Sequence, residues 1–258
     1  MDRLKIGLIQ PDLVWENIPA NLEHLKARIV RFNKEADILL LPELFTTGFT
    51  MRTAEFAERM EGNTVRWMKE LAVVTCAVIG GSIIIEDEGK YMNRFLWIRP
   101  DGQLTYYDKK HLFRMGEEDR HFTAGNSLKV IEHKGWRIRL NICYDLRFPV
   151  WSRNTGDYDL LIFIANWPER RKRVWKTLLQ ARAIENHCYV AGVNRIGTDG
   201  NGISYSGDSC VIDFKGYPVK FLPANKESAS IIEIDIDKLK KFRKKFPVNL
   251  DADPFKLL

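Results

Sequence analysis

Residues 139–149 read Arg139-Leu140-Asn141-Ile142-Cys143-Tyr144-Asp145-Leu146-Arg147-Phe148-Pro149, a strand-like segment that ends in a cysteine among charged residues. From Trp136 to Ile142, apolar residues alternate with Arg and Asn, and this period of two predicts a strand with one apolar face. Free cysteine is often a small buried hydrophobe, so Cys143 taken alone favours an inert core position. A reactive thiolate needs an electropositive or hydrogen-bonding setting. Other segments of the chain must therefore supply a base and a positive charge.

The composition is that of an ordinary globular protein. The chain has 258 residues, of which 45% are hydrophobic and 29% charged, and its formal net charge is +6. This length suits one large core, and we expect a single domain over residues 1–258. The positive charge is scattered except in the runs 170–173 and 238–245, and no basic tract alternates with aromatic residues. We therefore expect no nucleic-acid partner, whereas small anionic substrates suit the charge.

The cysteine pattern favours a reducing compartment. The four cysteines are Cys76, Cys143, Cys188 and Cys210. No pair has the spacing of metal ligands or of a disulfide framework, and free thiols persist where the environment is reducing. The N-terminal residues show no signal peptide, and no apolar run approaches the length that spans a bilayer. We expect a cytoplasmic protein with no membrane partner and no metal.

Strand and helix patterns alternate along the chain, with hairpins between them. Apolar runs predict strands at residues 4–10, 38–41, 77–86, 91–99, 104–108, 128–133, 136–142, 160–165, 189–194, 209–213, 219–222 and 228–234. Helical spacing predicts helices at residues 17–32, 64–75, 171–186 and 237–246. This mixture favours an α/β fold with mixed sheets that are covered by helices.

Details of these segments carry further expectations. The helix at 171–186 should turn one face inward, made of Val174, Leu178, Ala181 and Ile184. Asp237 is the expected cap of the last helix. The glycine-rich segment 197–207 lacks the spacing of phosphate-binding loops, so we interpret it as a surface loop. Residues 109–126 show no sustained period, and long irregular segments inside domains are often functional.

Three predicted strands end in residues that can do chemistry. One is followed by Glu43, one by Lys109 and one by Cys143. Ligands collect at the carboxyl ends of strands in layered α/β folds, and burial raises the pKa of a carboxylate so that it suits a general base. Each residue also has a structural interpretation, since Glu43 can pair with an arginine and Lys109 and Lys110 can form a solvated turn. The same placement at three strand ends favours a shared site.

The segments around these residues resemble a known family. Pro42-Glu43-Leu44-Phe45, Lys109-Lys110-His111-Leu112-Phe113 and the block 143–149 are similar, in order and spacing, to the three signature blocks of the nitrilase superfamily, the carbon–nitrogen hydrolases. The resemblance covers nearly the whole chain. Segments 46–51 and 205–209 are most similar to its omega-amidase branch, which hydrolyses the terminal amide of 2-oxoglutaramate and 2-oxosuccinamate.

The resemblance implies a fold and a set of roles. It implies a four-layer αββα sandwich, commonly a homodimer, that needs no cofactor. It makes Cys143 the nucleophile, Glu43 the general base and Lys109 the cation. Lys109 is chosen over Lys110 because one residue separates the family's lysine from its histidine, here His111. The family's second glutamate falls on Glu118, with Glu117 adjacent as the alternative. The backbone N–H of Tyr144 is then a candidate for holding the oxyanion.

Other residues near the blocks keep two interpretations. Arg147 can bind a substrate carboxylate, but an ion pair with Asp145 or with a partner subunit is the favoured interpretation. Asn166 and Trp167 follow a buried strand and either line the pocket or pack. The run Arg170-Arg171-Lys172-Arg173 is interpreted as a solvated basic patch, with an anion-attracting rim as the alternative.

Other functions remain open on the sequence. The same chemistry serves a nitrilase, a carbamoylase or an amidase for a modified peptide. A Cys–His hydrolase of unrelated fold would use His111 or His121 as its base. A non-catalytic basic binding module would show salt-dependent nucleic-acid binding and an unreactive Cys143.

Overall fold

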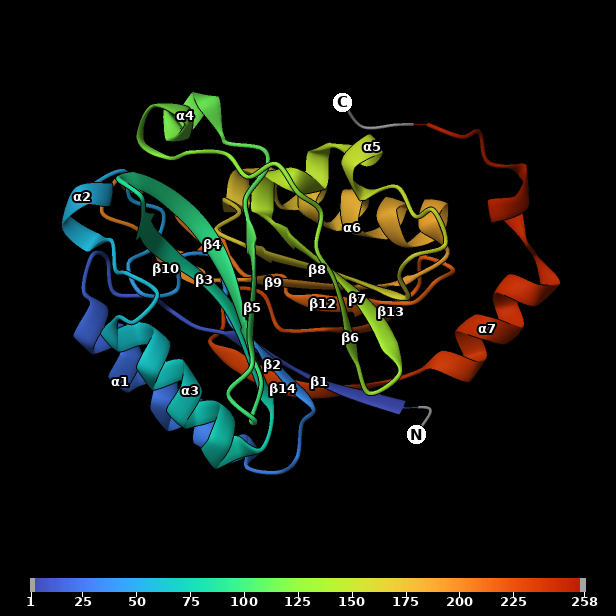
Figure 1. The fold of residues 1–258 in the computed structure, drawn as a ribbon, viewed down its shortest axis with the longest axis horizontal. Coiled ribbons are helices and arrows are strands. Elements are labelled where there is room, and N and C mark those ends of the chain that lie inside the picture. Colours follow the sequence, from blue (N-terminus) through green and yellow to red (C-terminus); the bar gives the residue numbers. More distant parts are fainter. Residues whose placement is uncertain (1–2, 256–258) are drawn as a thin grey trace.

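The computed structural model describes residues 3–255, which form two six-stranded sheets packed face to face between helices (Figure 1). The first sheet has the order β14 (Ser228–Asp235), β1 (Arg3–Gln10), β2 (Ile38–Leu40), β3 (Val78–Asp87), β4 (Lys90–Ile98), β5 (Leu104–Asp108). The second has the order β13 (Pro218–Phe221), β12 (Cys210–Ile212), β9 (Tyr189–Asn194), β8 (Leu160–Ala165), β7 (Trp136–Ile142), β6 (Val130–His133). A separate hairpin pairs β10 (Ile196–Thr198) with β11 (Ser204–Ser206).

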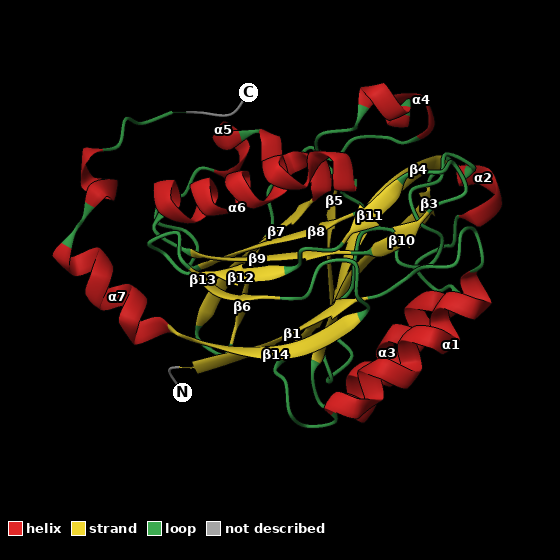
Figure 2. Ribbon diagram, turned by 180° about the vertical axis from the view of Figure 1, so that it is seen from behind, coloured by secondary structure: helices red, strands yellow, loops and turns green. Residues whose placement is uncertain are grey.

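Helices cover the outer face of each sheet. The α-helices are α1 (Ile18–Ile29), α2 (Thr53–Phe56), α3 (Asn63–Thr75), α4 (Glu118–His121), α5 (Pro149–Ser152), α6 (Lys172–Asn186) and α7 (Ile236–Lys245). The 3₁₀ helices are η1 (Val30–Phe32), η2 (Arg114–Gly116), η3 (Cys143–Arg147), η4 (Glu169–Arg171) and η5 (Val248–Asp251). Figure 2 shows α1 and α3 outside one sheet and α5 and α6 outside the other. This confirms the four-layer αββα sandwich.

The strand directions bring chemical groups to one edge of the sandwich. In the first sheet β1, β2 and β3 run parallel, and in the second β7, β8 and β9 do so. The remaining pairs are antiparallel, so both sheets are mixed. Parallel strands have their carboxyl ends at the same edge, where ligands bind in folds of this kind. Glu43 follows β2, Cys143 follows β7 and Asn166 follows β8 at such ends.

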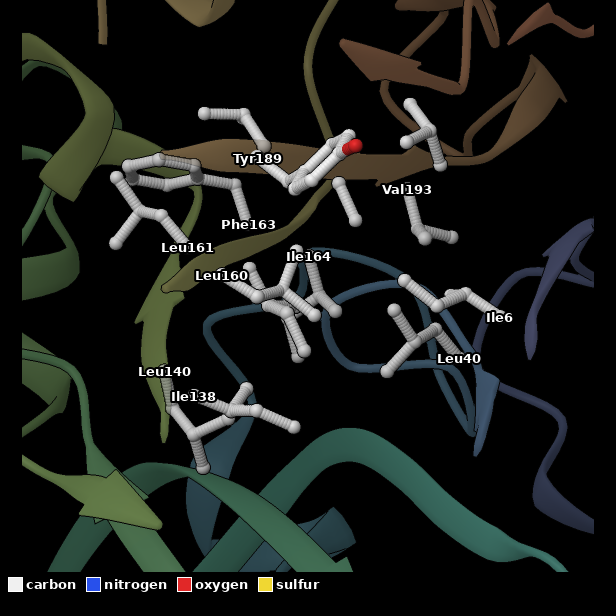
Figure 3. Packing of buried hydrophobic residues seen from close by; sticks show 14 of the residues in the cluster. Ile6, Leu40, Ile138, Leu140, Leu160, Leu161, Phe163, Ile164, Tyr189 and Val193 are labelled. Atoms are coloured by element: carbon white, nitrogen blue, oxygen red, sulfur yellow. The ribbon is translucent and has the colours of Figure 1, made fainter. Parts of the chain in front are cut away.

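The space between the sheets is filled by the apolar faces that the alternating pattern predicts. Trp136, Ile138, Leu140 and Ile142 of β7 are all 0–1% exposed. Figure 3 shows side chains of both sheets in this cluster, with Ile6 and Leu40 from the first and Ile138 and Ile164 from the second. Full burial of one such side chain stabilises the fold by about 1.5–3 kcal/mol. The core therefore holds the strand ends in place.

The prediction for the inner face of α6 is wrong by about one residue. Its buried residues are Trp175, Leu179, Arg182, Ala183 and Asn186. Val174 and Leu178 are only partly buried, and Ile184 is 51% exposed. The rotation follows from two polar side chains that the hydrophobic pattern assigned to solvent. Arg182 donates to the Leu146 carbonyl at 2.7 Å, and Asn186 donates to the Arg182 carbonyl at 3.0 Å, so both have hydrogen-bond partners inside the fold.

Two smaller predictions are also corrected. The cap of α7 is Asp235, whose side chain accepts from the backbone N–H groups of Asp237 and Lys238 at 2.9 and 3.2 Å. Strand β14 runs directly into this helix, so the cap lies two residues earlier than expected. Residues 197–207 contain the β10–β11 hairpin instead of an irregular surface loop. Among residues 3–255, no helix has both the length and the apolar composition needed to cross a membrane.

The environment of His133 predicts a pH dependence of stability. His133 is 7% exposed, and neither ring nitrogen has a hydrogen-bond partner among the described residues. Burial, followed by the charges of Arg99 and Lys134, lowers its pKa to about 4, against the opposing effect of Asp37 and Asp101. The folded state thus favours the neutral ring. The stability it contributes is present above the unfolded pKa of about 6.5 and is lost as the pH falls toward 4.

We therefore expect His133→Phe to reduce the loss of stability between pH 7 and pH 5. The phenyl ring keeps the edge-on packing against Trp97, whose ring centre lies 6.1 Å from that of His133, but cannot take up a proton. The free energy of unfolding should be measured by urea denaturation at both pH values for both proteins. Identical differences for wild type and variant would show that His133 does not contribute to the acid sensitivity.

Candidate active site

The ends of β2, β5 and β7 bring Glu43, Lys109 and Cys143 together. The Lys109 ammonium donates to Glu43 Oε1 at 2.7 Å. Lys109 and Cys143 line one cavity of about 480 Å³, and the charges of Glu43 and Lys109 both act on the Cys143 thiol. The three residues that the sequence singled out therefore form one cluster at one edge of the sandwich.

Glu43 is fixed by hydrogen bonds from three other elements. It is 0% exposed, and its Oε1 accepts from Lys109 and, at 2.8 Å, from the amide of Asn93 in β4. Its Oε2 accepts from the backbone N–H of Asn166 at 2.8 Å. The Asn166 side chain in turn donates to the Glu43 carbonyl at 2.5 Å. This carboxylate is thus held in one orientation before any substrate arrives.

Lys109 is shared between two carboxylates. Besides Glu43, it donates to Glu118 Oε1 and Oε2 at 2.8 and 2.9 Å. Burial alone lowers its pKa, but Glu118 and Glu43 outweigh burial, so the Lys109 pKa is raised and the group stays an ammonium. Lys110 points elsewhere, with its ammonium 5.4 Å from the centre of the Trp151 ring. The structure thus places Lys109 in the site and Lys110 outside it.

Glu118 and not Glu117 is the second carboxylate of the cluster. Glu118 is 0% exposed and also accepts from the backbone N–H of Phe113 at 2.6 Å. Burial raises the Glu118 pKa, Lys109 lowers it and Glu43 raises it, with a net upward shift. Glu117 is exposed and pairs with Arg120 at 2.5 Å.

Cys143 sits in a constrained turn that starts η3. Its φ is +43°, a left-handed value that costs a non-glycine residue about 1–3 kcal/mol. Burial and then the Glu43 carboxylate raise the pKa of the Cys143 thiol, whereas Lys109 lowers it, and the net shift is strongly upward. The thiol is therefore protonated at rest near pH 7. Its conversion to a nucleophile requires a base, and Glu43 is the neighbouring carboxylate.

Asp145 holds the turn around Cys143. Its carboxylate accepts from the Ile142 N–H at 3.0 Å and from the Tyr107 hydroxyl at 2.7 Å. It also binds the backbone N–H and the ring Nδ1 of His111 at 3.0 and 2.7 Å. The His111 ring stacks on Phe148 with centres 3.7 Å apart. Asp145 is thus fully used inside the fold.

These contacts remove the histidine alternative and correct one prediction for Arg147. His111 is bound to Asp145 and His121 is exposed, and neither lines the cavity. Arg147 has no ion pair with Asp145 or any other described carboxylate. Its guanidinium instead lies over the Trp167 ring, 5.1 Å from the ring centre, on the cavity wall.

The cavity wall joins predicted and unexpected residues. Tyr144, Arg147, Asn166 and Trp167 line it as expected. The β10–β11 hairpin adds Asp199, Asn201, Ile203 and Tyr205, so the supposed surface loop is part of the site. Within residues 3–255, no group of three or more His, Cys, Asp or Glu side chains is placed to hold a metal ion.

Asn93 is the clearest functional residue that the sequence analysis missed. Its amide donates to Glu43 at 2.8 Å and approaches Glu118 Oε1 at 3.4 Å, so it links both carboxylates. The available signal was a pair of polar residues, Asn93 and Arg94, directly before the apolar end of β4, where a buried polar side chain must find a partner.

Comparisons with known proteins agree with this geometry. The model of the carbon–nitrogen hydrolase family matches residues 5–244. The omega-amidase YafV of Escherichia coli K12 is 46% identical over 257 residues, which cover 100% of both chains. The 2-oxoglutaramate amidase of Bacillus subtilis is 31% identical, covering 94% of this chain and 95% of that protein. A crystal structure of a CN-hydrolase superfamily protein from Xanthomonas campestris, with an arsenic adduct in its active site, superimposes with a TM-score of 0.98 at 44% identity, covering 100% of both chains.

The shared ammonium predicts that Lys109 and Lys110 differ sharply in their contribution to stability. Lys109→Met leaves Glu43 and Glu118 buried without their cation, and such a loss typically costs about 3–5 kcal/mol. Lys110→Met is the matched control, with an expected change within about 0.5 kcal/mol. Urea denaturation at pH 7 measures both. The penalty in Lys109→Met should shrink at lower pH, because a protonated Glu118 carries no charge; equal penalties in the two variants would contradict the proposed role of Lys109.

Proposed function

The chain belongs to the carbon–nitrogen hydrolase family, and on that basis we propose that it hydrolyses the terminal amide of a short 2-oxo dicarboxylic acid to the free acid and ammonia. The leading candidates are 2-oxoglutaramate and 2-oxosuccinamate. The relatives named omega-amidase YafV and 2-oxoglutaramate amidase support this substrate class. The observation that carries the proposal is the Glu43–Lys109 pair beside Cys143, in a cavity whose wall holds arginines without carboxylate partners.

The first half of the reaction forms a thioester. Glu43 takes the proton of the Cys143 thiol as Sγ attacks the amide carbon, which suits a thiol whose pKa is raised. The Lys109 ammonium and the backbone N–H of Tyr144 hold the oxyanion, and the loss of one such donor typically costs roughly 10²–10³ in kcat. Glu43 returns the proton to the amide nitrogen, the C–N bond breaks and ammonia leaves.

The second half releases the acid. Glu43 removes a proton from water, whose oxygen attacks the thioester carbon. The S–C bond breaks, and the proton returns to Cys143, so the enzyme is restored. Glu118 acts through Lys109, because its two contacts at 2.8 and 2.9 Å keep the ammonium charged and in position. This chain of steps uses side chains of the protein and needs no cofactor.

We also infer an anionic substrate and a homodimer. Arg147 on the cavity wall supplies a partner for the carboxylate of a 2-oxo acid. Val150 of α5 and Ile184 of α6 are 59% and 51% exposed on the outer helical layer, which suits a contact between two copies.

One hydrophobic cluster includes both sheets and α6, which supports a single domain. The four free thiols support the expected reducing compartment, the cytoplasm.

Cys143 is expected to be the one cysteine that activity requires. Cys143→Ala should abolish ammonia release, since no thioester can form, while its thermal unfolding stays close to that of wild type. Cys76→Ala is the control, because Cys76 is exposed at the end of α3 and does not line the cavity. Mass spectrometry of wild type quenched during turnover should locate the acyl adduct on Cys143. Activity retained in Cys143→Ala, or an adduct elsewhere, contradicts the mechanism.

The substrate class is tested by the carboxylate. Wild type should hydrolyse 2-oxoglutaramate with a kcat/KM at least about 10²-fold above that for pentanamide, a neutral amide of the same chain length. The neutral amide leaves the polar groups that would bind the carboxylate without a partner. Ammonia release measures both. Equal values would refute carboxylate recognition and indicate a general amidase.

A further inference from the structure

Three arginines on the cavity wall have no carboxylate partner. Arg147, Arg170 and Arg171 all line the cavity that contains Cys143. None of them takes part in an ion pair or a side-chain hydrogen bond with another described residue, although most arginines of this chain do. Unpaired guanidinium groups in one cavity repel one another, so an anion that enters between them relieves an unfavourable arrangement.

Arg171 is placed and oriented by aromatic side chains. Its guanidinium lies over the Phe113 ring at 5.2 Å from the ring centre, and Phe113 packs edge-on against Tyr144, next to Cys143, at 5.0 Å. The indole N–H of Trp167 donates to the Arg171 carbonyl at 2.9 Å, and the same indole carries the Arg147 guanidinium. One aromatic wall therefore holds both arginines.

Neighbouring positive charges disfavour the charged form of Arg171. Burial, followed by the charge of Arg170, lowers the pKa of Arg171, and Arg147 acts in the same direction.

The two carboxylates on the cavity wall do not neutralise this cluster. Glu16 pairs with Arg52 and accepts from the Thr50 hydroxyl at 2.5 Å. Asp199 accepts from the Tyr205 hydroxyl at 2.8 Å and from the backbone N–H groups of Asn201 and Ile203 at 2.9 and 3.0 Å. Asp199 has only neutral donors and keeps its charge, but five cationic side chains outnumber the two acids on the cavity wall, so the net charge of the lining is positive.

We propose that Arg171 and Arg147 form a two-arginine clamp for the carboxylate of the substrate, and that Arg171 determines the specificity for anionic over neutral amides. The inference rests on the proposed function and deepens it. Two planar guanidinium groups held on ring faces present several N–H donors, and arginine binds a carboxylate through paired hydrogen bonds. When the clamp holds the carboxylate, the amide at the other end of the short chain lies at Cys143. Within the run 170–173, Arg170 and Arg171 then line the cavity, whereas Lys172 and Arg173 belong to the basic surface.

The decisive experiment compares Arg171→Met with Arg173→Met. Arg173 is exposed in the first turn of α6 and does not line the cavity, so its variant removes the same charge without removing the contact. We expect Arg171→Met to lower kcat/KM for 2-oxoglutaramate by about 10- to 100-fold, mostly through KM, because the carboxylate is held in substrate and transition state alike. Its kcat/KM for pentanamide should stay within about twofold of wild type, which also shows that the variant is folded.

The control separates contact from general attraction. Arg173→Met should leave kcat/KM unchanged for both substrates. The loss of kcat/KM in Arg171→Met should persist at high salt, where long-range attraction is screened. Three results overturn the clamp: no loss in Arg171→Met, an equal loss for both substrates, or an equal loss in Arg173→Met. A wild type that does not favour 2-oxoglutaramate over pentanamide overturns the proposed function itself, so the two failures are distinguishable.

Discussion

The structure depends on one buried ammonium between two buried carboxylates. Lys109 satisfies Glu43 and Glu118 at 2.7–2.9 Å, and all three side chains are 0–1% exposed. Removing such charges from water is expensive, and their attraction repays the cost only when further donors complete the arrangement. Asn93 in β4, the Asn166 N–H after β8 and the Phe113 N–H supply these donors. Both sheets and the loop after β5 must therefore be in register before the charges can be buried.

The constrained turn at Cys143 adds a second condition. A φ of +43° is unfavourable for a non-glycine residue, and Asp145 holds the turn through four hydrogen bonds to β7, to the loop after β5 and to Tyr107. The raised pKa of the Cys143 thiol disfavours the thiolate and not the resting thiol. The Cys143 thiol is thus neutral at rest, and under the proposed mechanism its proton passes to Glu43 only when a substrate is attacked. The site holds a neutral thiol in a rigid turn. A permanently charged thiolate would need a more electropositive surrounding.

Local patterns predicted mixed sheets covered by helices and the three strand-end residues, because period-two alternation and buried apolar runs are decided by near neighbours in the sequence. The four-layer order of the sandwich came from the family resemblance. The errors arose where polar groups are buried through distant partners. Arg182 and Asn186 rotate α6 inward, and Asn93 joins two carboxylates from other elements, which no local pattern shows. The choice of Glu118 over Glu117 followed family spacing, and only the contact with Lys109 gives its physical reason. An ion pair of Arg147 with Asp145 or a partner subunit was the favoured interpretation, but His111, Tyr107 and Ile142 occupy the Asp145 carboxylate.

The cavity has a floor and a wall of different origin. The floor is built from strand ends and carries the buried charges, whereas much of the wall comes from η4 and the β10–β11 hairpin, which contribute none of them. Substitutions in the wall can therefore alter which acyl group fits without disturbing the buried charges of the floor. Such a division allows related enzymes to evolve different substrate specificities while they keep the same reaction chemistry. It also makes the wall the natural starting point for laboratory evolution toward new amides.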